Sequence, residues 1–159
     1  MKAVGGILLI VAALLLSVFL ERGEKRRVRA LVALAELLRV SEEEIGFYGR
    51  PLVEIIANFE NDDLHIMGFF EKARTGDLYG GLVAVTENSG LLPSEIAPLF
   101  SLFREGLPPR AAAAESALRA VREELLRKTE LLRSEGKRRV SLFRAVAGAG
   151  TAIAVLLLL

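Results

Sequence analysis

The sequence predicts an all-α protein, with N- and C-terminal transmembrane helices flanking a helical bundle of about five to six helices. Residues 3–20 and residues 145–159 carry no charged side chain, and apolar residues between them recur three and four positions apart. A membrane-spanning helix needs about 20 mostly apolar residues, within a range of about 17–25. No alternating apolar–polar run of useful length predicts a strand. We therefore expect a helical hairpin through a membrane, with a domain of residues 21–139 between its legs.

The two predicted spans differ in how well their lengths fit a bilayer. The first, 3–20, is long enough by itself, whereas the second reaches span length only as 140–159, with Arg144 turned toward the lipid headgroups. A cleaved signal peptide would have a shorter apolar core and a small-residue cleavage site, and neither is present before Glu21. A lipid-anchor signal would place an uncharged polar spacer before the apolar tail, but a basic cluster stands there.

Basic residues next to the spans predict the orientation. Ten lysines and arginines lie inside the hairpin close to the spans, and one, Lys2, lies outside it. The ten are Arg22, Lys25, Arg26, Arg27 and Arg29 after the first span, and Arg133, Lys137, Arg138, Arg139 and Arg144 before or at the start of the second. Lysine and arginine beside a span stay on the cytoplasmic side. We expect a cytoplasmic domain with both termini outside the cell membrane.

The composition narrows the classes of partner. The chain has no cysteine, which excludes disulfides and thiol chemistry and fits a cytoplasmic domain. Residues 30–132 carry ten Lys/Arg and seventeen Asp/Glu, so their net charge is 10 − 17 = −7. An acidic domain argues against nucleic acid as a partner. Basic flanks, in contrast, suit anionic lipid headgroups.

The first helix of the domain is predicted to continue out of the first span. Val28, Leu31, Ala35 and Leu38 form one apolar stripe at helical spacing. Glu42, Glu43 and Glu44 extend this helix or end it. Gly49-Arg50-Pro51 then interrupts the chain, and Pro51 suits the first turn of a second helix that reaches Phe59.

Three short helices are expected next. Asn61-Asp62-Asp63 are capping residues for a helix from Leu64 to about Arg74. Thr75-Gly76-Asp77 breaks the chain and caps a helix over about 78–87, which Gly90 stops. Pro93-Ser94-Glu95 opens another helix, whose apolar stripe runs from Ile96 to Phe103 and which ends at Gly106.

The last helix is predicted to be the longest, over about 110–139. Its apolar seam is interrupted by Lys128, and we expect a bend at Gly136 before the second span. The seam consists of Ala114, Leu118, Val121, Leu125 and Leu132. Because the first and last helices both leave the membrane, we expect them to pair antiparallel as a stalk, with the short helices capping its far end.

No catalytic constellation can be assembled from this sequence. The single histidine, His65, follows Asp62 and Asp63, but a di-iron site would require a second such motif and further inward-facing glutamates. Gly76-x-x-x-Gly80-Gly81 is not followed by Lys-Ser/Thr, so it is not a phosphate loop. We expect no enzymatic activity, no metal, no cofactor and no small-molecule substrate.

Residues 34–52 resemble a stretch of the stage III sporulation protein AB family of endospore-forming bacteria. The matching residues are Leu38, Glu44, Ile45, Tyr48, Pro51 and Leu52. The order of parts is also similar, from a short N-terminal span to a glycine-containing C-terminal span that ends in leucines. The chain departs from the family in lacking tryptophan and in reading Arg104-Glu-Gly-Leu-Pro-Pro109 where the family has a Leu-Gly, small-Asp, Gln segment.

The resemblance implies a platform subunit of a membrane complex between mother cell and forespore. The family's soluble domain is similar to that of the platform protein of type II secretion and type IV pilus machines. A cytoplasmic secretion-type ATPase and neighbouring membrane subunits would be the partners, and Glu42, Glu43 and Glu44 are the candidate partner surface. Two alternatives stay open: a metal-dependent membrane protein that uses Asp62 and His65, and a two-span oligomer unrelated to sporulation.

Overall fold

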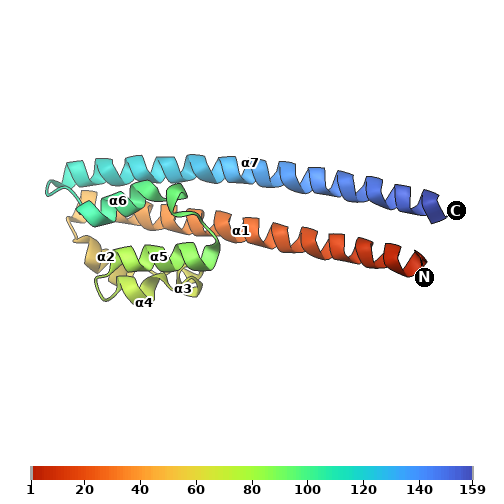
Figure 1. Ribbon diagram of the computed structural model, residues 1–159. Coiled ribbons are helices and arrows are strands. Elements are labelled where there is room, and N and C mark those ends of the chain that lie inside the picture. The colour runs from red at the N-terminus through yellow and green to blue at the C-terminus, as the bar shows by residue number, and fades with distance from the viewer. Residues whose placement is uncertain (1, 159) are drawn as a thin grey trace. The chain divides into compact units, whose positions relative to one another are not determined.

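The computed structural model describes the backbone of residues 2–158 and the side chains of residues 11–12, 15–142, 145–146 and 148–150. Within this part of the chain all regular structure is helical, which confirms the predicted all-α class (Figure 1). The elements are α1 (Lys2–Tyr48), α2 (Leu52–Asn58), α3 (Asp62–Ile66), α4 (Phe69–Ala73), α5 (Leu78–Ser89), the 3-10 helix η1 (Pro93–Glu95), α6 (Ala97–Glu105) and α7 (Ala111–Leu158).

The chain divides into two compact units. The terminal unit consists of Met1–Lys25 and Leu131–Leu159, and the central unit consists of Arg26–Glu130. Because α1 and α7 are long, each contributes residues to both units. The central unit falls inside the domain predicted at 21–139.

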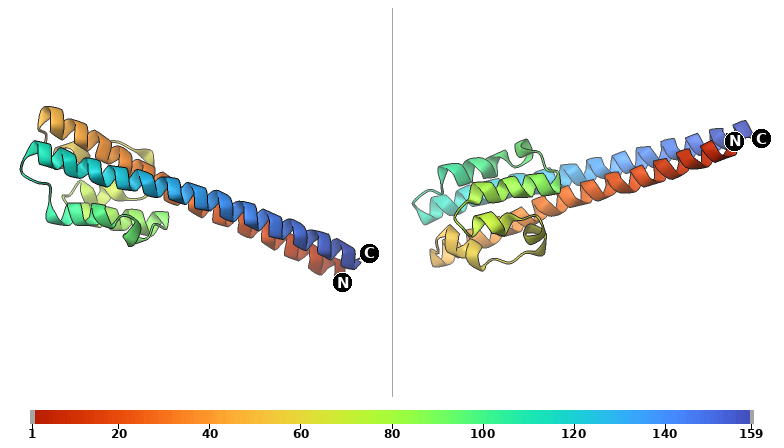
Figure 2. Two further views of the ribbon diagram at one scale, coloured as in Figure 1. Left: turned by 90° about the horizontal axis from the view of Figure 1, so that it is seen from above. Right: turned by 60° about the horizontal axis from the view of Figure 1, so that its bottom comes forward.

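In the terminal unit, α1 and α7 lie side by side and run antiparallel (Figures 1 and 2). The start of α1 and the end of α7 lie at the same end of this pair. The two helices are bridged where Arg139 Nη1 lies 3.4 Å from Glu24 Oε1. The predicted antiparallel pairing is therefore present in this unit.

Among the described residues, no helix contains a stretch both long and apolar enough to cross a bilayer. The predicted spans 3–20 and 140–159 fall partly outside the described side chains, which exclude residues 1–10, 13–14, 143–144, 147 and 151–159.

The central unit is organised around one segment of α1. Seven of the nine residues from 30 to 38 are buried, so this stretch is covered on nearly every side. They are Ala30, Leu31, Ala33, Leu34, Ala35, Leu37 and Leu38. A helix that is apolar all round belongs inside a core, and the predicted stripe is thus one part of a wider buried surface.

The short helices lie along α1 in the central unit. Figures 1 and 2 show α5 running beside α1. Arg26, Arg27 and Arg29, at the start of this segment, reach Asn88, Glu95 and Asp63 respectively. A segment that is buried on so many faces requires cover along its length, and the short helices supply it.

The helix predicted over 64–74 is two helices. Gly68 adopts a left-handed conformation (φ +78°), which ends α3 and lets α4 begin in a new direction. Met67, Phe69 and Phe70 are all buried around this break. A glycine at a positive φ costs little, so the chain can turn here between the two helices.

The remaining helix ends follow the sequence closely. Asn61 Oδ1 accepts a hydrogen bond from the Leu64 amide at 3.1 Å, and Asp77 Oδ1 accepts one from the Gly80 amide at 2.7 Å. Gly90 and Gly106 end α5 and α6 at positive φ. Pro51 is the residue before α2, and Pro93-Ser94-Glu95 forms a 3-10 turn ahead of α6.

Helix α7 continues through Gly136 without interruption. On the predicted seam, Ala114, Leu118 and Leu125 are buried, while Val121 and Leu132 are half-buried. Lys128, which interrupts the seam, donates from Nζ to the Glu95 carbonyl oxygen at 2.9 Å. The apparent defect in the seam is therefore a link from α7 to η1.

Gly81 gives a direct test of the packing between α4 and α5. A Cβ atom there would lie 3.0 Å from both the backbone oxygen and a ring carbon of Phe69. We predict that Gly81→Ala lowers the free energy of unfolding by about 1–3 kcal/mol, as overpacking does. Denaturant unfolding of the full chain in mild detergent, followed by circular dichroism, measures this change.

Gly23→Ala is the matched control. Nothing lies within 4 Å of a Cβ atom at that position, and alanine is favoured over glycine inside a helix by up to about 1 kcal/mol. Equal stability of the Gly81→Ala variant and the wild-type chain would contradict the close approach of α4 and α5.

Candidate functional site

Glu42 links α1 to α7 inside the central unit. Its side chain is only 11% exposed, and it accepts a hydrogen bond from Arg119 Nε at 2.7 Å. Arg122 Nη2 lies 3.0 Å from its other oxygen. The hydrogen bond that Arg119 donates to Glu42 raises the pKa of the Arg119 guanidinium. Glu42 therefore connects α1 to α7 through two arginines.

Glu43 and Glu44 also have arginine partners, but in other directions. Arg39 Nη1 lies 2.6 Å from Glu43 Oε1 along α1, and Arg50 Nη1 lies 2.9 Å from Glu44 Oε2. Consecutive helical residues do not face one another, so these side chains and Glu42 do not form one continuous acidic patch. Binding of a partner to these three glutamates stays a prediction.

Arg39 ties two carboxylates together on the outer face of α1. It donates from Nε and Nη2 to Glu36 at 3.0 and 2.7 Å, besides its bond to Glu43. The hydrogen bond from Arg39 lowers the pKa of Glu36, and the same bond raises the pKa of Arg39. Both side chains are well exposed, so this ion pair adds little to stability.

Acidic side chains without an ion pair in the described part of the chain are found on the short helices and their ends. They are Glu54, Glu60, Asp62, Glu71, Asp77, Glu87 and Glu105, and Glu123 of α7 also has no ion pair with a described residue. The sequence had indicated an acidic domain, but it could not show which carboxylates are neutralised by arginines from α1 and α7. Most of the unpaired negative charge among the described residues thus lies in the α2–α6 region.

A groove of about 640 Å³ lies between α5 and α6. Its aromatic part is the pair Tyr79 and Phe100, whose ring centroids are 5.0 Å apart. The Arg104 guanidinium lies over the Tyr79 ring at 5.2 Å, and Arg104 Nη2 donates to the Tyr79 hydroxyl at 3.4 Å. Ser101 Oγ donates to Glu105 at 2.8 Å. No functional role was predicted for this region from the sequence.

The residues on which the resemblance to the sporulation family rests have different environments. Leu38 and Ile45 are buried, whereas Tyr48 is 71% exposed. Pro51 is exposed and Leu52 is half-buried. Part of the matching segment is therefore core, and the part around Tyr48 is accessible to a partner, next to an 83% exposed Phe47.

Asp62, Asp63 and His65 do not converge on one point with other metal-binding side chains. Among the described residues, no group of three or more His, Cys, Asp or Glu side chains has the proximity to hold a metal ion. Asp63 lies 3.8 Å from Arg29 Nη1, while Asp62 and His65 are exposed. No described contact favours the alternative metal-dependent function.

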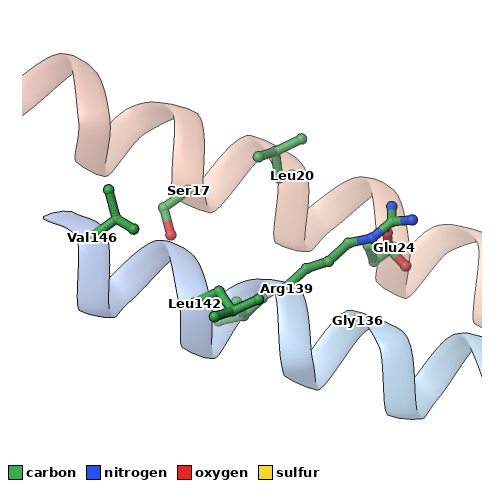
Figure 3. A pocket seen from close by; sticks show the side chains of 8 residues that line it. Ser17, Leu20, Glu24, Gly136, Arg139, Leu142 and Val146 are labelled. Atoms are coloured by element: carbon green, nitrogen blue, oxygen red, sulfur yellow. The ribbon is translucent and has the colours of Figure 1, made fainter.

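A second groove, of about 460 Å³, lies between α1 and α7 in the terminal unit (Figure 3). Its walls are mainly apolar, and Figure 3 shows Arg139 reaching across it toward Glu24. Its lining residues are Ser17, Leu20, Glu24, Gly136, Arg139, Val140, Leu142 and Val146. The groove therefore has an uncharged end at Ser17 and Val146 and a charged end at Glu24 and Arg139.

The predicted membrane-flanking cations are only partly neutralised. Lys25 pairs with Glu21 at 2.8 Å, and Arg27 pairs with Glu95. Arg26 donates to the Asn88 carbonyl oxygen. Four of these cations have no ion pair with any described residue: Arg22, Arg26, Lys137 and Arg138. Arg144 lies outside the described side chains.

Comparison with known proteins does not assign the chain to a family. No protein-family profile, curated protein or solved structure matches the chain.

Exchange of a single carboxylate tests the role of Glu42. In Glu42→Gln, Arg119 and Arg122 lose their shared anion, and we predict a loss of about 1–3 kcal/mol in the free energy of unfolding. Glu43→Gln removes an exposed i,i+4 pair on the same helix and should cost less than about 0.5 kcal/mol.

Denaturant unfolding of both variants beside the wild-type chain measures the difference. Equal effects of the two substitutions would show that the bond between α1 and α7 at Glu42 is no stronger than a surface ion pair.

Proposed function

We propose that this protein is a non-enzymatic, membrane-anchored subunit that docks other proteins of a membrane complex. The observation that carries the proposal is the exposure of apolar side chains in the terminal unit. The resemblance of residues 34–52 to the stage III sporulation protein AB family supports the same function.

The exposed apolar residues of α1 are not confined to one face. In the part of α1 that belongs to the terminal unit, six described apolar residues are at least 46% exposed, and Phe19 reaches 76%. They are Val11, Leu15, Leu16, Val18, Phe19 and Leu20. With 3.6 residues per turn, positions 18, 19 and 20 point in three different directions. Each such side chain gains about 1.5–3 kcal/mol when it leaves water, and a lipid environment would supply this gain around the whole helix.

The charges and the helix directions favour one orientation. Basic residues lie on the domain side of both predicted spans and stay in the cytoplasm under the positive-inside rule. An antiparallel pair places the start of α1 and the end of α7 on one side of a membrane (Figure 2). The central unit would then face the cytoplasm, on the mother-cell side if the chain works in a sporulation complex.

The central unit would serve as the docking part of the subunit. Most of its carboxylates without an ion pair lie on the short helices and their ends, and charge complementarity with a basic partner surface raises encounter rates and specificity. The family resemblance favours a cytoplasmic secretion-type ATPase and neighbouring membrane subunits as partners. Neither nucleic acid nor a small-molecule substrate is part of the proposal.

Single-cysteine labelling in cells tests the anchoring and the orientation. The chain has no cysteine, so a Thr75→Cys variant carries one thiol, on an exposed residue between α4 and α5. We predict that a membrane-impermeant maleimide labels this thiol only after the cell is permeabilised, and that the chain stays in the membrane after alkaline carbonate extraction.

Lys2→Cys is the matched variant, because the proposal places this position outside the cell, where the reagent reaches it in intact cells. Labelling of Thr75→Cys in intact cells, or release of the chain by carbonate, would exclude the proposed anchoring.

A further inference from the structure

We propose that the groove between α5 and α6 binds an amphipathic helix of a partner protein, with basic side chains at both ends of the bound segment. The proposal deepens the docking part of the proposed function, on which it rests, and it does not depend on how the terminal unit is anchored.

The floor of the groove offers an apolar and aromatic contact surface. Tyr79 and Val83 come from α5, and Ala97 and Phe100 come from α6. Tyr79 is 42% exposed, although its ring is already oriented by Phe100 and Arg104. Aromatic side chains that are held in place lose little conformational freedom on binding, which makes them effective contact residues.

Two carboxylates without an ion pair give the groove a negative charge. Glu87 lies toward the end of α5 and Glu105 ends α6, and both line the groove. The third charged residue, Arg104, stacks on Tyr79 and has no ion pair with a described carboxylate. Arg104 lies beside Tyr79, so the end of the groove at Glu105 is close to the start of α5. Glu87 lies eight residues after Tyr79 on α5, which corresponds to a rise of about 12 Å along the helix.

These dimensions fit two turns of a helix. Apolar residues at i, i+3, i+4 and i+7 cover about this length and would lie on the aromatic floor, the usual form of helix-in-groove recognition. One lysine or arginine at each end of the bound helix, the two being about two turns apart, would reach Glu87 and Glu105. The charge of the lining disfavours an acidic helix and nucleic acid.

A peptide titration of the full chain in neutral detergent tests the groove. A bimane fluorophore on Ser94→Cys reports binding, because Ser94 lines the groove with an exposed side chain. The probe is a synthetic helix of about 15 residues with leucines at the four stripe positions and lysines at both ends. A second peptide with glutamates in place of the lysines is its matched partner.

The expected result is a saturable change in bimane emission with the lysine peptide and none with the glutamate peptide. The double variant Glu87→Gln, Glu105→Gln should weaken binding at least about tenfold. Ala97→Phe, which fills the groove, should abolish it. The control pair Glu54→Gln, Glu71→Gln removes two free carboxylates that do not line the groove and should change affinity by less than about twofold.

Three results would overturn the proposal. These are equal binding of the two peptides, equal losses in the groove and control variants, and an Ala97→Phe variant that binds normally. Self-association in sedimentation that Ala97→Phe abolishes would assign the groove to a second copy of this chain and would overturn it too. Cysteine labelling and carbonate extraction do not involve the groove, so anchoring succeeds or fails independently of these results.

Discussion

The structure depends on the burial of one stretch of α1, residues 30–38, on nearly every face. No single neighbouring helix can cover such a segment, so the chain surrounds it with α7 and the five short helices of the central unit. Its buried leucines, with Ile56, Leu64, Phe69, Leu82, Leu99 and Leu118 from the surrounding helices, supply the fully buried core. Each of these side chains contributes about 1.5–3 kcal/mol through burial. Polar contacts then determine how the helices are arranged around this core.

Two sets of polar contacts connect the long helices. Glu42 of α1 binds Arg119 and Arg122 of α7. In η1, the Glu95 carboxylate pairs with Arg27 of α1 while its backbone carbonyl accepts from Lys128 of α7. The Glu95 side chain also accepts a hydrogen bond from the Leu92 amide at 2.7 Å, which closes the turn that begins α6. The connection between α5 and α6 is thereby fixed to both long helices, and the groove that these short helices form has a defined shape.

Much of the fold could be predicted from the sequence, because its signals were local. Asn61, Asp77, Gly90 and Gly106 mark helix ends by side-chain capping or by a positive φ, and each acts where it was expected. The break at Gly68 was missed, since a lone glycine inside an apolar pattern is also compatible with a continuous helix. The ion pairs were missed for a different reason. Whether Glu42 or Glu87 is free depends on which arginines of distant segments lie beside it, and residue spacing carries no such information.

The central claim is that one helix, α1, passes from a protein core at residues 30–38 to a lipid environment at residues 11–20. Spin labels on single cysteines along α1, with the chain in lipid vesicles, measure this most directly through collision with oxygen and with a water-soluble nickel chelate. The account predicts that labels at Leu15, Val18 and Phe19 collide with oxygen but not with the chelate, and that a label at Lys25 collides with the chelate. A label at Leu34 should be shielded from both. Free access of the chelate to Leu15, Val18 and Phe19 would contradict the account.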